Sequence, residues 1–541
     1  MTIPFSFPLP VAACVVGLVL AGTGAGQGAG PKPPNIVFIL ADDLGIMDVN
    51  QYAIRLGGRK KESLFYETPH IDRLVNQGVA FSQAYANQLC SPTRAAIMTG
   101  RIASRLGVTT ATPRTPTYYN QGLPVPAGFS PHDAFRHQDR IQRTLAWGNA
   151  HTNTAISPKL PTLPKVLAGH DSAFIGKWHL GGHGAEGRQP RDHGFRELAY
   201  FDAGGSPYFK WRPLWNQKKL PYPKMPQKQS EMGKAGPATG KPYLTDDLTV
   251  QAVTYLKERA RTPDQPFFLY FCHFAVHTPL QAKAAEIARF RKKPQLGNGG
   301  HDNATYAAMV KSLDDSVGAI MATLRETGLA DNTVVVFTSD NGGVEYTHPA
   351  ATDNAPFKGG KACLFEGGVR VPLVYYQPGR FDQSAWCDAV VDCTDFLPTL
   401  AELTHNPIPG NIDGKSTVPA LKHPAASQPD RTLYWHYPFN VIVKHPDNGL
   451  PLTPHSAIRV GNDKLIWDWH GKLELYDMAN DPFEKKDLAP GNPELTQRLF
   501  KQLKAWLKAN VEPRYFPRLN RHYMPKEEKR EAFRNLWHDR K

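Results

Sequence analysis

The sequence contains no apolar run long enough to cross a membrane. The run from Val11 to Leu20 lies within the first thirty residues, which carry no charged side chain, and small residues follow it up to Gly30. A membrane span requires about 20 apolar residues, so we expect none. Although the usual Lys or Arg near the start is missing, the pattern is typical of a signal peptide. We expect residues 1–30 to be a signal peptide and the protein to be exported, either periplasmic or secreted.

The sequence also lacks a basic run and the Cys/His spacing of a zinc knuckle, so we do not expect nucleic acid as a partner. Its 63 Lys and Arg exceed its 49 Asp and Glu, which gives a formal net charge of +14. This excess favours anionic partners of some other kind. A chain of 541 residues with 41% hydrophobic residues is globular, with roughly two to four domains or one large domain with appendages.

Cysteine is scarce, with six residues in the whole chain. Without the first thirty residues five cysteines remain, and an odd number leaves at least one thiol unpaired. Sequence spacing does not define disulfide geometry, so a bond between Cys387 and Cys393 stays open. The five residues are Cys90, Cys272, Cys363, Cys387 and Cys393.

Four apolar runs end in polar residues, as buried strands of a parallel sheet do. They are "NIVFIL" followed by "ADD", "SAFIGKWHLGG", "PFFLYFCHFAVHTP" and "TVVVFTSDNGG". Between them, residues 305–329 carry apolar side chains at helical spacing. This alternation predicts an α/β sheet covered by helices on both faces. Ligands of such sheets bind beyond the carboxyl ends of the strands, where these polar clusters lie.

The pattern changes near residue 431 to short strand-like runs, and an amphipathic helix follows near 493–510. This predicts a smaller antiparallel sheet with one helix. We divide the chain into a signal peptide at 1–30, a main catalytic domain at 31–430, a C-terminal subdomain at 431–512 and a basic tail at 513–541. The tail is a candidate mobile arm.

Two long stretches, 102–160 and 203–243, interrupt the α/β pattern. Structureless loops of this length are uncommon in compact domains unless they are functional. They are therefore candidates for walls that select a substrate. An equally good interpretation is that both stretches are surface insertions without a role in function.

Oxygen-bearing side chains follow two of the predicted strands. Each pair by itself could be a helix cap or a turn. Together, without Cys or His among them, they suit Ca²⁺ or Mg²⁺ better than zinc. The four residues are Asp42, Asp43, Asp340 and Asn341.

Cationic side chains gather at the same predicted edge: Lys177, His179, His277 and Lys361. Strand alternation would place Lys177 and His179 on one face. A lone His at a strand end is more often a hydrogen-bonded polar residue than a catalyst. With a metal and two lysines, however, the imidazoles could act as general acid and base on a tetrahedral oxyanion. Sulfate and phosphate esters both fit.

Cys90 opens the stretch "CSPTRAAIMTGR", in which Pro92 and Arg94 follow at fixed spacing. Ordinary thiol chemistry requires neither residue. The stretch resembles the signature of the formylglycine-dependent sulfatases, in which such a cysteine is oxidised to an aldehyde after synthesis. Six further stretches resemble that family in the same order and cover most of residues 34–490: "NIVFILADDLG", "GKWHLGG", "HTP", "SDNGG", "KGGKACLFEGGVRVP" and "LYDMANDPFEKKDLA".

The resemblance implies an arylsulfatase-type enzyme with the alkaline-phosphatase-like fold. That fold has a large, mostly parallel mixed sheet between helices, and a smaller C-terminal antiparallel sheet with a helix. The resemblance also implies a maturation enzyme that converts Cys90 to formylglycine. One hydroxyl of the hydrated aldehyde attacks sulfur and the other later expels sulfate, whereas a serine would be trapped as its own sulfate. A divalent cation, Ca²⁺ rather than Mg²⁺, would be held by Asp42, Asp43, Asp340, Asn341 and modified Cys90.

The resemblance further implies roles for five side chains. Arg94 would fix the hydrated aldehyde, and Lys177 and Lys361 would neutralise the sulfate oxygens. His179 would accept the proton of the second hydroxyl, and His277 would donate a proton to the leaving alcohol.

Three other features of the matched motifs bear on substrate binding. Lys358 lies in the motif of Lys361, but the spacing to "EGG" favours Lys361. His193 in "DHGF" is either a substrate contact or a structural loop residue. After "ADDLG" the chain departs from the family's usual glycine and aromatic residues and reads "IMDVNQYAIRLGGRKK". The wall beside the metal therefore differs, which leaves the substrate open.

We expect a sulfatase that hydrolyses a sulfate ester of a sulfated carbohydrate, with which export and the basic charge agree. A first alternative is a phosphodiester or phosphonate hydrolase of the same superfamily, which a preference for phosphodiesters in one assay would favour. A second is a catalytically silent protein that binds sulfated glycans and keeps Cys90 as a thiol.

Overall fold

A computed structural model describes most of the chain from Lys32 to His538. The described residues are 32–112, 117–118, 130–131, 143–181, 187–202, 204–209, 211, 243–381, 384–426, 430–439, 443–527 and 532–538. Residues Pro33–Lys541 form one compact unit, and the predicted signal peptide lies outside the described residues. Within the described part of the chain, no helix combines the length and the apolar character that a bilayer crossing requires.

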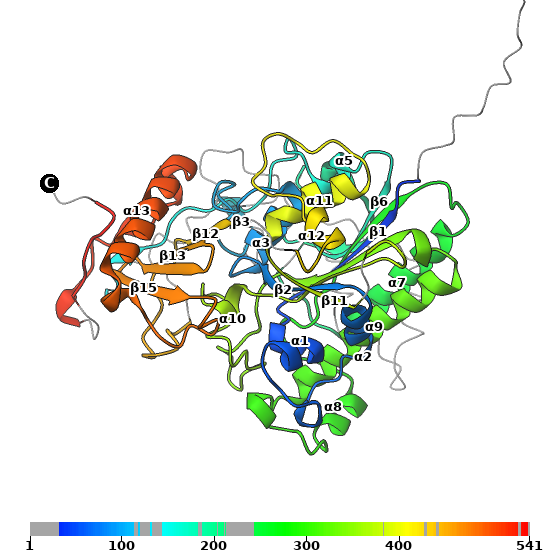
Figure 1. Cartoon of the computed structure of the whole chain (residues 1–541), viewed down its shortest axis with the longest axis horizontal. Helices are drawn as coiled ribbons and strands as arrows, with labels where there is room; N and C mark the ends of the chain where they lie inside the picture. Colours follow the sequence, from blue (N-terminus) through cyan, green and yellow to red (C-terminus); the bar gives the residue numbers. More distant parts are fainter. Residues whose placement is uncertain are drawn as a thin grey trace, which may run out of the picture. The chain divides into compact units, whose positions relative to one another are not determined.

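An eight-stranded sheet runs through the centre of this unit (Figure 1). All of its strands run in one direction except β10, which is antiparallel to both of its neighbours. The predicted large, mostly parallel mixed sheet is therefore confirmed. From edge to edge the strands are β11 (Ala385–Asp392), β2 (Val79–Tyr85), β10 (Leu373–Tyr376), β9 (Thr333–Ser339), β1 (Asn35–Ala41), β8 (Phe267–Cys272), β6 (Asp171–Lys177) and β7 (Arg196–Phe201).

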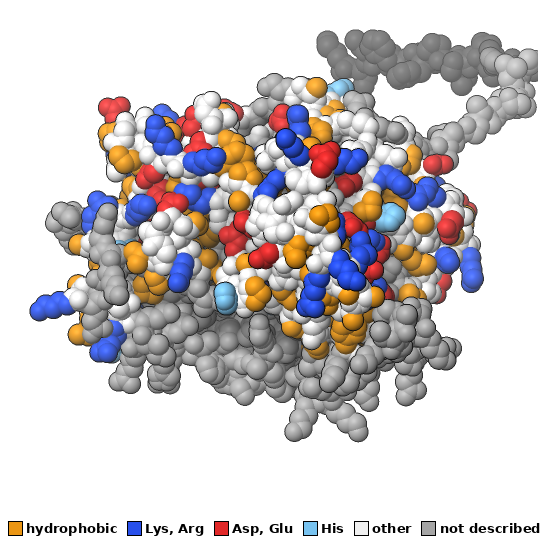
Figure 2. All heavy atoms as spheres, turned by 90° about the horizontal axis from the view of Figure 1, so that it is seen from below, with side chains coloured by type: hydrophobic (Ala, Val, Ile, Leu, Met, Phe, Trp, Pro, Cys, Tyr) orange, Lys and Arg blue, Asp and Glu red, His pale blue; other side chains and the backbone are white. Residues whose placement is uncertain are grey.

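Helices cover both faces of the sheet, which explains why its central strands are continuous apolar runs. One face packs on α1 (Asn50–Arg55), α2 (Pro69–Gln77), α7 (Leu244–Arg259), α8 (Ala284–Phe290) and α9 (Ala304–Glu326). The other packs on α3 (Cys90–Thr99), α5 (Leu163–Val166), α11 (Phe396–Leu403) and α12 (Val418–Lys422). On the surface in Figure 2, Lys and Arg side chains are interspersed with Asp and Glu.

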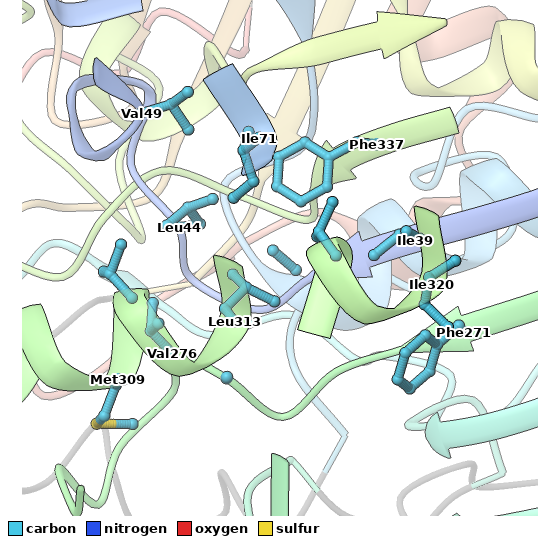
Figure 3. Packing of buried hydrophobic residues seen from close by; sticks show 14 of the residues in the cluster. Ile39, Leu44, Val49, Ile71, Phe271, Val276, Met309, Leu313, Ile320 and Phe337 are labelled. Carbon is cyan, nitrogen blue, oxygen red and sulfur yellow. The ribbon is translucent and has the colours of Figure 1, made fainter. Parts of the chain in front are cut away.

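The largest buried cluster lies between the sheet and α9 (Figure 3). Side chains of β1 alternate between the faces, so Ile39 joins this cluster whereas Phe38 joins the cluster on the other face. Leu313 and Ile320 of α9 are fully buried against the sheet, and each buried aliphatic side chain contributes about 1.5–3 kcal/mol. The helix predicted at residues 305–329 is confirmed with slightly different ends.

The C-terminal region forms the expected antiparallel sheet with one helix. Its strands are, in order, β12 (Thr432–Tyr437), β13 (His455–Val460), β14 (Asp463–Asp468) and β15 (Lys472–Asp477). Helix α13 (Pro493–Asn510) buries Leu499, Leu503 and Leu507 against this sheet. The short helix α10 (Glu366–Val369) packs on the opposite face. The remaining short strands are β3 (Thr117–Tyr118), β4 (Ser130–Pro131), β5 (Trp147–Gly148) and β16 (Arg518–Leu519).

The part of the tail beyond residue 512 that the structure describes is packed, whereas the sequence suggested a mobile arm. Strand β16 pairs with β5. The Trp537 ring stacks on Trp467 at 6.1 Å between centroids and lies 4.6 Å from the Phe516 ring. The prediction considered only the basic residues of the tail. Its aromatic side chains pack against the C-terminal sheet and α13 and keep the described part in place.

All five cysteines outside the predicted signal peptide are free and buried. The bond between Cys387 and Cys393 that the sequence left open is therefore absent from the described residues. Asn87 donates instead to Sγ of Cys393 at 3.4 Å. Four of the thiols behave as small buried apolar groups, and Cys90 is considered below.

We predict that Trp537→Ala lowers the free energy of unfolding by about 2 kcal/mol, because it removes a partly buried ring from the aromatic cluster. Chemical denaturation would measure the change. His538→Ala, at the exposed neighbouring position, is the control and should leave stability unchanged. Equal stability of both variants and the unchanged protein would show that the tail is not packed in solution.

Candidate active site

Two pairs of polar residues lie side by side at the carboxyl edge of the sheet. Asp42 and Asp43 follow β1, and Asp340 and Asn341 follow β9, whose last residue is in register with the last residue of β1. All four side chains are buried. The Asn341 amide donates to Oδ1 of Asp43 at 2.8 Å, and the backbone N–H of Asp43 donates to Oδ1 of Asp340 at 3.2 Å.

Three buried cations neutralise these carboxylates. Burial by itself would raise the pKa of Asp43, but Lys361 and His277 hold that pKa below its usual range. An unpaired charge here would carry a desolvation penalty of several kcal/mol, so each cation has a carboxylate partner. The pairs are Arg94 with Asp340 at 2.7 Å, Lys177 with Asp42 at 2.7 Å and Lys361 with Asp43 at 2.6 Å.

Cys90 is the first residue of α3 and is almost fully buried. Its Sγ lies within 4.8 Å of a carboxylate oxygen of both Asp42 and Asp340. Burial raises the pKa of the thiol, although Lys177 and Lys361 oppose the shift. Because the thiolate is the reactive form of cysteine, an unmodified Cys90 is a poor nucleophile at neutral pH.

His179 reaches the site, but not by strand alternation. Strand β6 ends at Lys177, and the backbone of His179 has φ of +57°. Nε2 of His179 donates to the carbonyl of Thr112 at 3.1 Å. Nδ1 is buried and has no hydrogen-bond partner among the described residues, so its lone pair is available. Burial and the neighbouring Lys177 lower the pKa of His179 well below its usual value, and the imidazole is neutral at pH 7.

His277 faces the same carboxylates from the loop after β8. Its Nδ1 donates to the carbonyl of Thr278 at 2.6 Å, and its Nε2 lies 3.6 Å from Oδ2 of Asp43. The hydroxyl of Tyr208 donates to the carbonyl of His277 at 2.9 Å. Burial and Lys361 lower the pKa of His277, while Asp43 opposes that shift.

Three residues in or beside the site have the left-handed backbone that non-glycine residues rarely adopt. They are Asp43 with φ of +65°, His179 with φ of +57° and Ala362, next to Lys361, with φ of +72°. Such strain is kept only where surrounding contacts hold it, and it concentrates at functional sites.

The sequence analysis missed three residues that shape the site. Thr112 accepts the hydrogen bond from His179. A Cβ on Gly204 would lie 2.9 Å from Nε2 of His179, and one on Gly205 would lie 3.0 Å from Nδ1 of His277. Gly-Gly in "DAGGSP" was the available signal for close approach, whereas nothing in the sequence marked Thr112. The described ends of both long interrupting stretches therefore contact the site histidines.

Two other motif residues, His193 and Lys358, make their contacts with other parts of the chain. The ring of His193 is buried and packs against Trp178 at 5.3 Å between centroids, and burial lowers its pKa to about 3. This favours the structural reading. Nζ of Lys358 donates to Asp447 at 2.8 Å and lies over the rings of Phe365 and Tyr476, which agrees with the choice of Lys361 for the site.

The donor set fits a hard divalent cation. Oδ1 of Asn341 is buried and accepts no hydrogen bond within the described part of the chain. Ligand atoms of Asp42, Cys90 and Asp340 lie within 4.8 Å of one another. Carboxylate and amide oxygens are the ligands that Ca²⁺ and Mg²⁺ prefer. The structure thus brings the ten predicted site residues together: Asp42, Asp43, Cys90, Arg94, Lys177, His179, His277, Asp340, Asn341 and Lys361.

Residues 34–406 match the family model described as Sulfatase. The chain belongs to the sulfatase family. Residues 359–512 also match the model described as N-sulphoglucosamine sulphohydrolase, C-terminal. This sulfatase is 31% identical over 539 residues to a sulfatase of Formosa agariphila, with 92% of each chain covered. It is 33% identical over 414 residues to human N-acetylgalactosamine-6-sulfatase, which covers 74% of this chain and 67% of the human one.

Solved structures agree with this assignment. The crystal structure of Ps i-CgsB in complex with k-i-k-neocarrahexaose has a TM-score of 0.66 and 27% identity, and covers 90% of this sulfatase and 95% of that chain. The fold of this sulfatase is alkaline-phosphatase-like, as the family resemblance implied.

We predict that Arg94→Leu lowers the free energy of unfolding by about 3 kcal/mol in EDTA, because Asp340 is left as an uncompensated buried charge. Adding Asp340→Asn to that variant should restore much of the loss. Denaturant unfolding measures both, with the exposed Arg261→Leu as a neutral control. Equal stability of Arg94→Leu and the control would contradict the pairing.

Proposed function

We propose that this sulfatase hydrolyses a sulfate ester of a sulfated carbohydrate, with formylglycine made from Cys90 as the nucleophile and with bound Ca²⁺. The observation that carries the proposal is the place of Cys90. It is buried at the start of α3, within 4.8 Å of ligand atoms of Asp42 and Asp340. The positive charges of Lys177 and Lys361 act to lower the pKa of its thiol.

The chain's own residues would orient the modified side chain. Formylglycine supplies two hydroxyls on one carbon when hydrated, one to attack sulfur and one to release sulfate. Arg94 lies one helical turn after Cys90 and therefore on the same face of α3. Its Nη1 donates to the carbonyl of Lys177 at 2.9 Å, and its Nη2 pairs with Asp340, so the guanidinium is held in one position beside residue 90.

Positive charge would stabilise the sulfate group. Lys177 and Lys361 would pair with its oxygens as negative charge develops on them, in a buried site where such interactions are strong. Asp42, Asp43, Asp340 and Asn341 would hold the cation, which supplies further positive charge next to the sulfate.

The two histidines would carry the protons. His179 is neutral and has a free lone pair on Nδ1, so it would accept the proton of the second hydroxyl. Nδ1 of His277 is bonded to the Thr278 carbonyl, so a proton on Nε2 would pass to the leaving alcohol. The carboxylate of Asp43, 3.6 Å from Nε2, would stabilise that proton against burial and Lys361, which lower the pKa of His277.

The relatives support a carbohydrate as the alcohol. One is named for an N-acetylgalactosamine sulfate ester, and the solved neighbour holds a neocarrahexaose. The net charge of +14 agrees with a polyanionic substrate. The stretches 102–160 and 203–243, whose described ends contact His179 and His277, would select the sugar.

We predict an aldehyde or its hydrate at Cys90 in the tryptic peptide Leu74–Arg94, from protein made in a host that has the maturation enzyme. Mass spectrometry measures it. Cys90→Ala should lower kcat on sulfated saccharides by at least about 10³-fold, whereas Cys387→Ala, which also removes a buried free thiol, should keep the modification and the activity.

Either of two results would contradict the proposal. An unmodified thiol with phosphodiester turnover above sulfate ester turnover would favour the phosphoester hydrolase. Binding of sulfated glycans without turnover, unchanged in Cys90→Ala, would favour the catalytically silent protein.

We predict that Ca²⁺ at 100 times its Kd stabilises the protein by about 2.7 kcal/mol over the EDTA-treated form. The shift in thermal unfolding measures this independently of activity. Asn341→Ala should remove most of the shift, because it deletes a buried oxygen ligand, and the exposed Asn448→Ala should keep it. A full shift in Asn341→Ala would place the cation elsewhere.

A further inference from the structure

A groove of about 590 Å³ lies between α13 and the C-terminal segment, residues 532–538, outside the candidate active site. Helix α13 is at the left edge in Figure 1, away from α3 in the centre, and the C-terminal segment runs beside it. Among the described residues that line this α13 groove there is no Asp or Glu. Its basic lining residues are Lys501, Lys504, Lys508, Arg534 and His538.

The three lysines form one row along the groove. Lys501, Lys504 and Lys508 are three and four residues apart, so they share a face of α13 over about 10.5 Å at 1.5 Å per residue. Contacts hold two of them: Nζ of Lys504 donates to the carbonyl of Leu536 at 3.0 Å, and Nζ of Lys508 lies 5.5 Å from the Trp537 ring centre. The positive charges of Lys504 and Lys508 therefore stand at defined positions.

The opposite wall is fixed as well. Nη2 of Arg534 donates to the carbonyl of Gly471 at 2.7 Å, and its backbone N–H donates to the carbonyl of His470. Apolar side chains of Phe500, Ala505 and Leu536 and the amides of Gln497 and Asn535 also line the groove. This composition differs from the face in Figure 2, where basic and acidic side chains are mixed.

We propose that the α13 groove is a second binding site of this protein, which holds a sulfated polysaccharide chain. Sulfate groups would pair with the lysine row and Arg534, and the faces of the sugar rings would lie on the apolar part of the lining. The proposal rests on the proposed function, because the sulfated polymer is then the polyanion that this protein meets. A chain held there raises the effective concentration of its sulfate esters at the active site.

Binding of dextran sulfate to the full-length protein tests this. Lys501→Gln/Lys508→Gln should raise the Kd roughly tenfold at low salt, because two of the contacts that release counterions are lost. The control, Lys257→Gln/Lys292→Gln, removes two exposed lysines outside the groove, and its Kd should stay within about twofold of the unchanged protein. Turnover of 4-nitrophenyl sulfate should be the same in all three proteins, because the active site is intact.

An equal Kd for the groove variant and the control would overturn the proposal. A matching tenfold loss of affinity for duplex DNA would overturn it too, because the groove would then be a general polyanion site. Loss of aryl sulfate turnover in the unchanged protein would contradict only the proposed function, since the binding comparison does not depend on turnover.

Discussion

The pairing of buried opposite charges at the carboxyl edge of the sheet is the constraint on which the rest of the structure depends. Arg94, Lys177 and Lys361 come from α3, β6 and the loop before α10, and each meets a carboxylate that follows β1 or β9. None of these charges could be buried alone, so the segments must meet together. This pairing of opposite charges also brings together the side chains that would bind a sulfate ester.

A second buried ion cluster carries this constraint into the C-terminal sheet. Nζ of Lys464 on β14 lies 2.8 Å from Oε1 of Glu366 and 2.8 Å from Oε1 of Glu484. Glu366 begins α10, five residues after Lys361. The C-terminal sheet therefore supports the loop that places Lys361 in the site. We predicted a domain boundary at residue 430, and the C-terminal family model matches residues 359–512, on both sides of it. The contact of Glu366 with Lys464 also joins the two sides of that boundary.

Local backbone strain and close packing complete the site. The left-handed residues Asp43 and His179 turn their side chains out of the strand direction, and Gly204 and Gly205 let the second long stretch approach the histidine rings. The strain persists because buried contacts hold both residues: Asp43 pairs with Lys361, and His179 donates to the carbonyl of Thr112. Thr112, in the first long stretch, accepts a hydrogen bond from His179. Both long stretches therefore lie against histidines of the site.

The sequence by itself determined four strands of the central sheet, β1, β6, β8 and β9, together with helix α9, the C-terminal sheet and the motif residues of the site. Periodicity and strand-end polarity depend on near neighbours in the chain. Tertiary structure alone decided what depends on distant segments. It turned His179 by a left-handed residue instead of strand alternation, buried His193 against Trp178, and packed the tail through Trp537. It also brought the cations of α13 beside Arg534. Close approach between distant segments follows from side-chain packing and charge compensation, which no local pattern encodes.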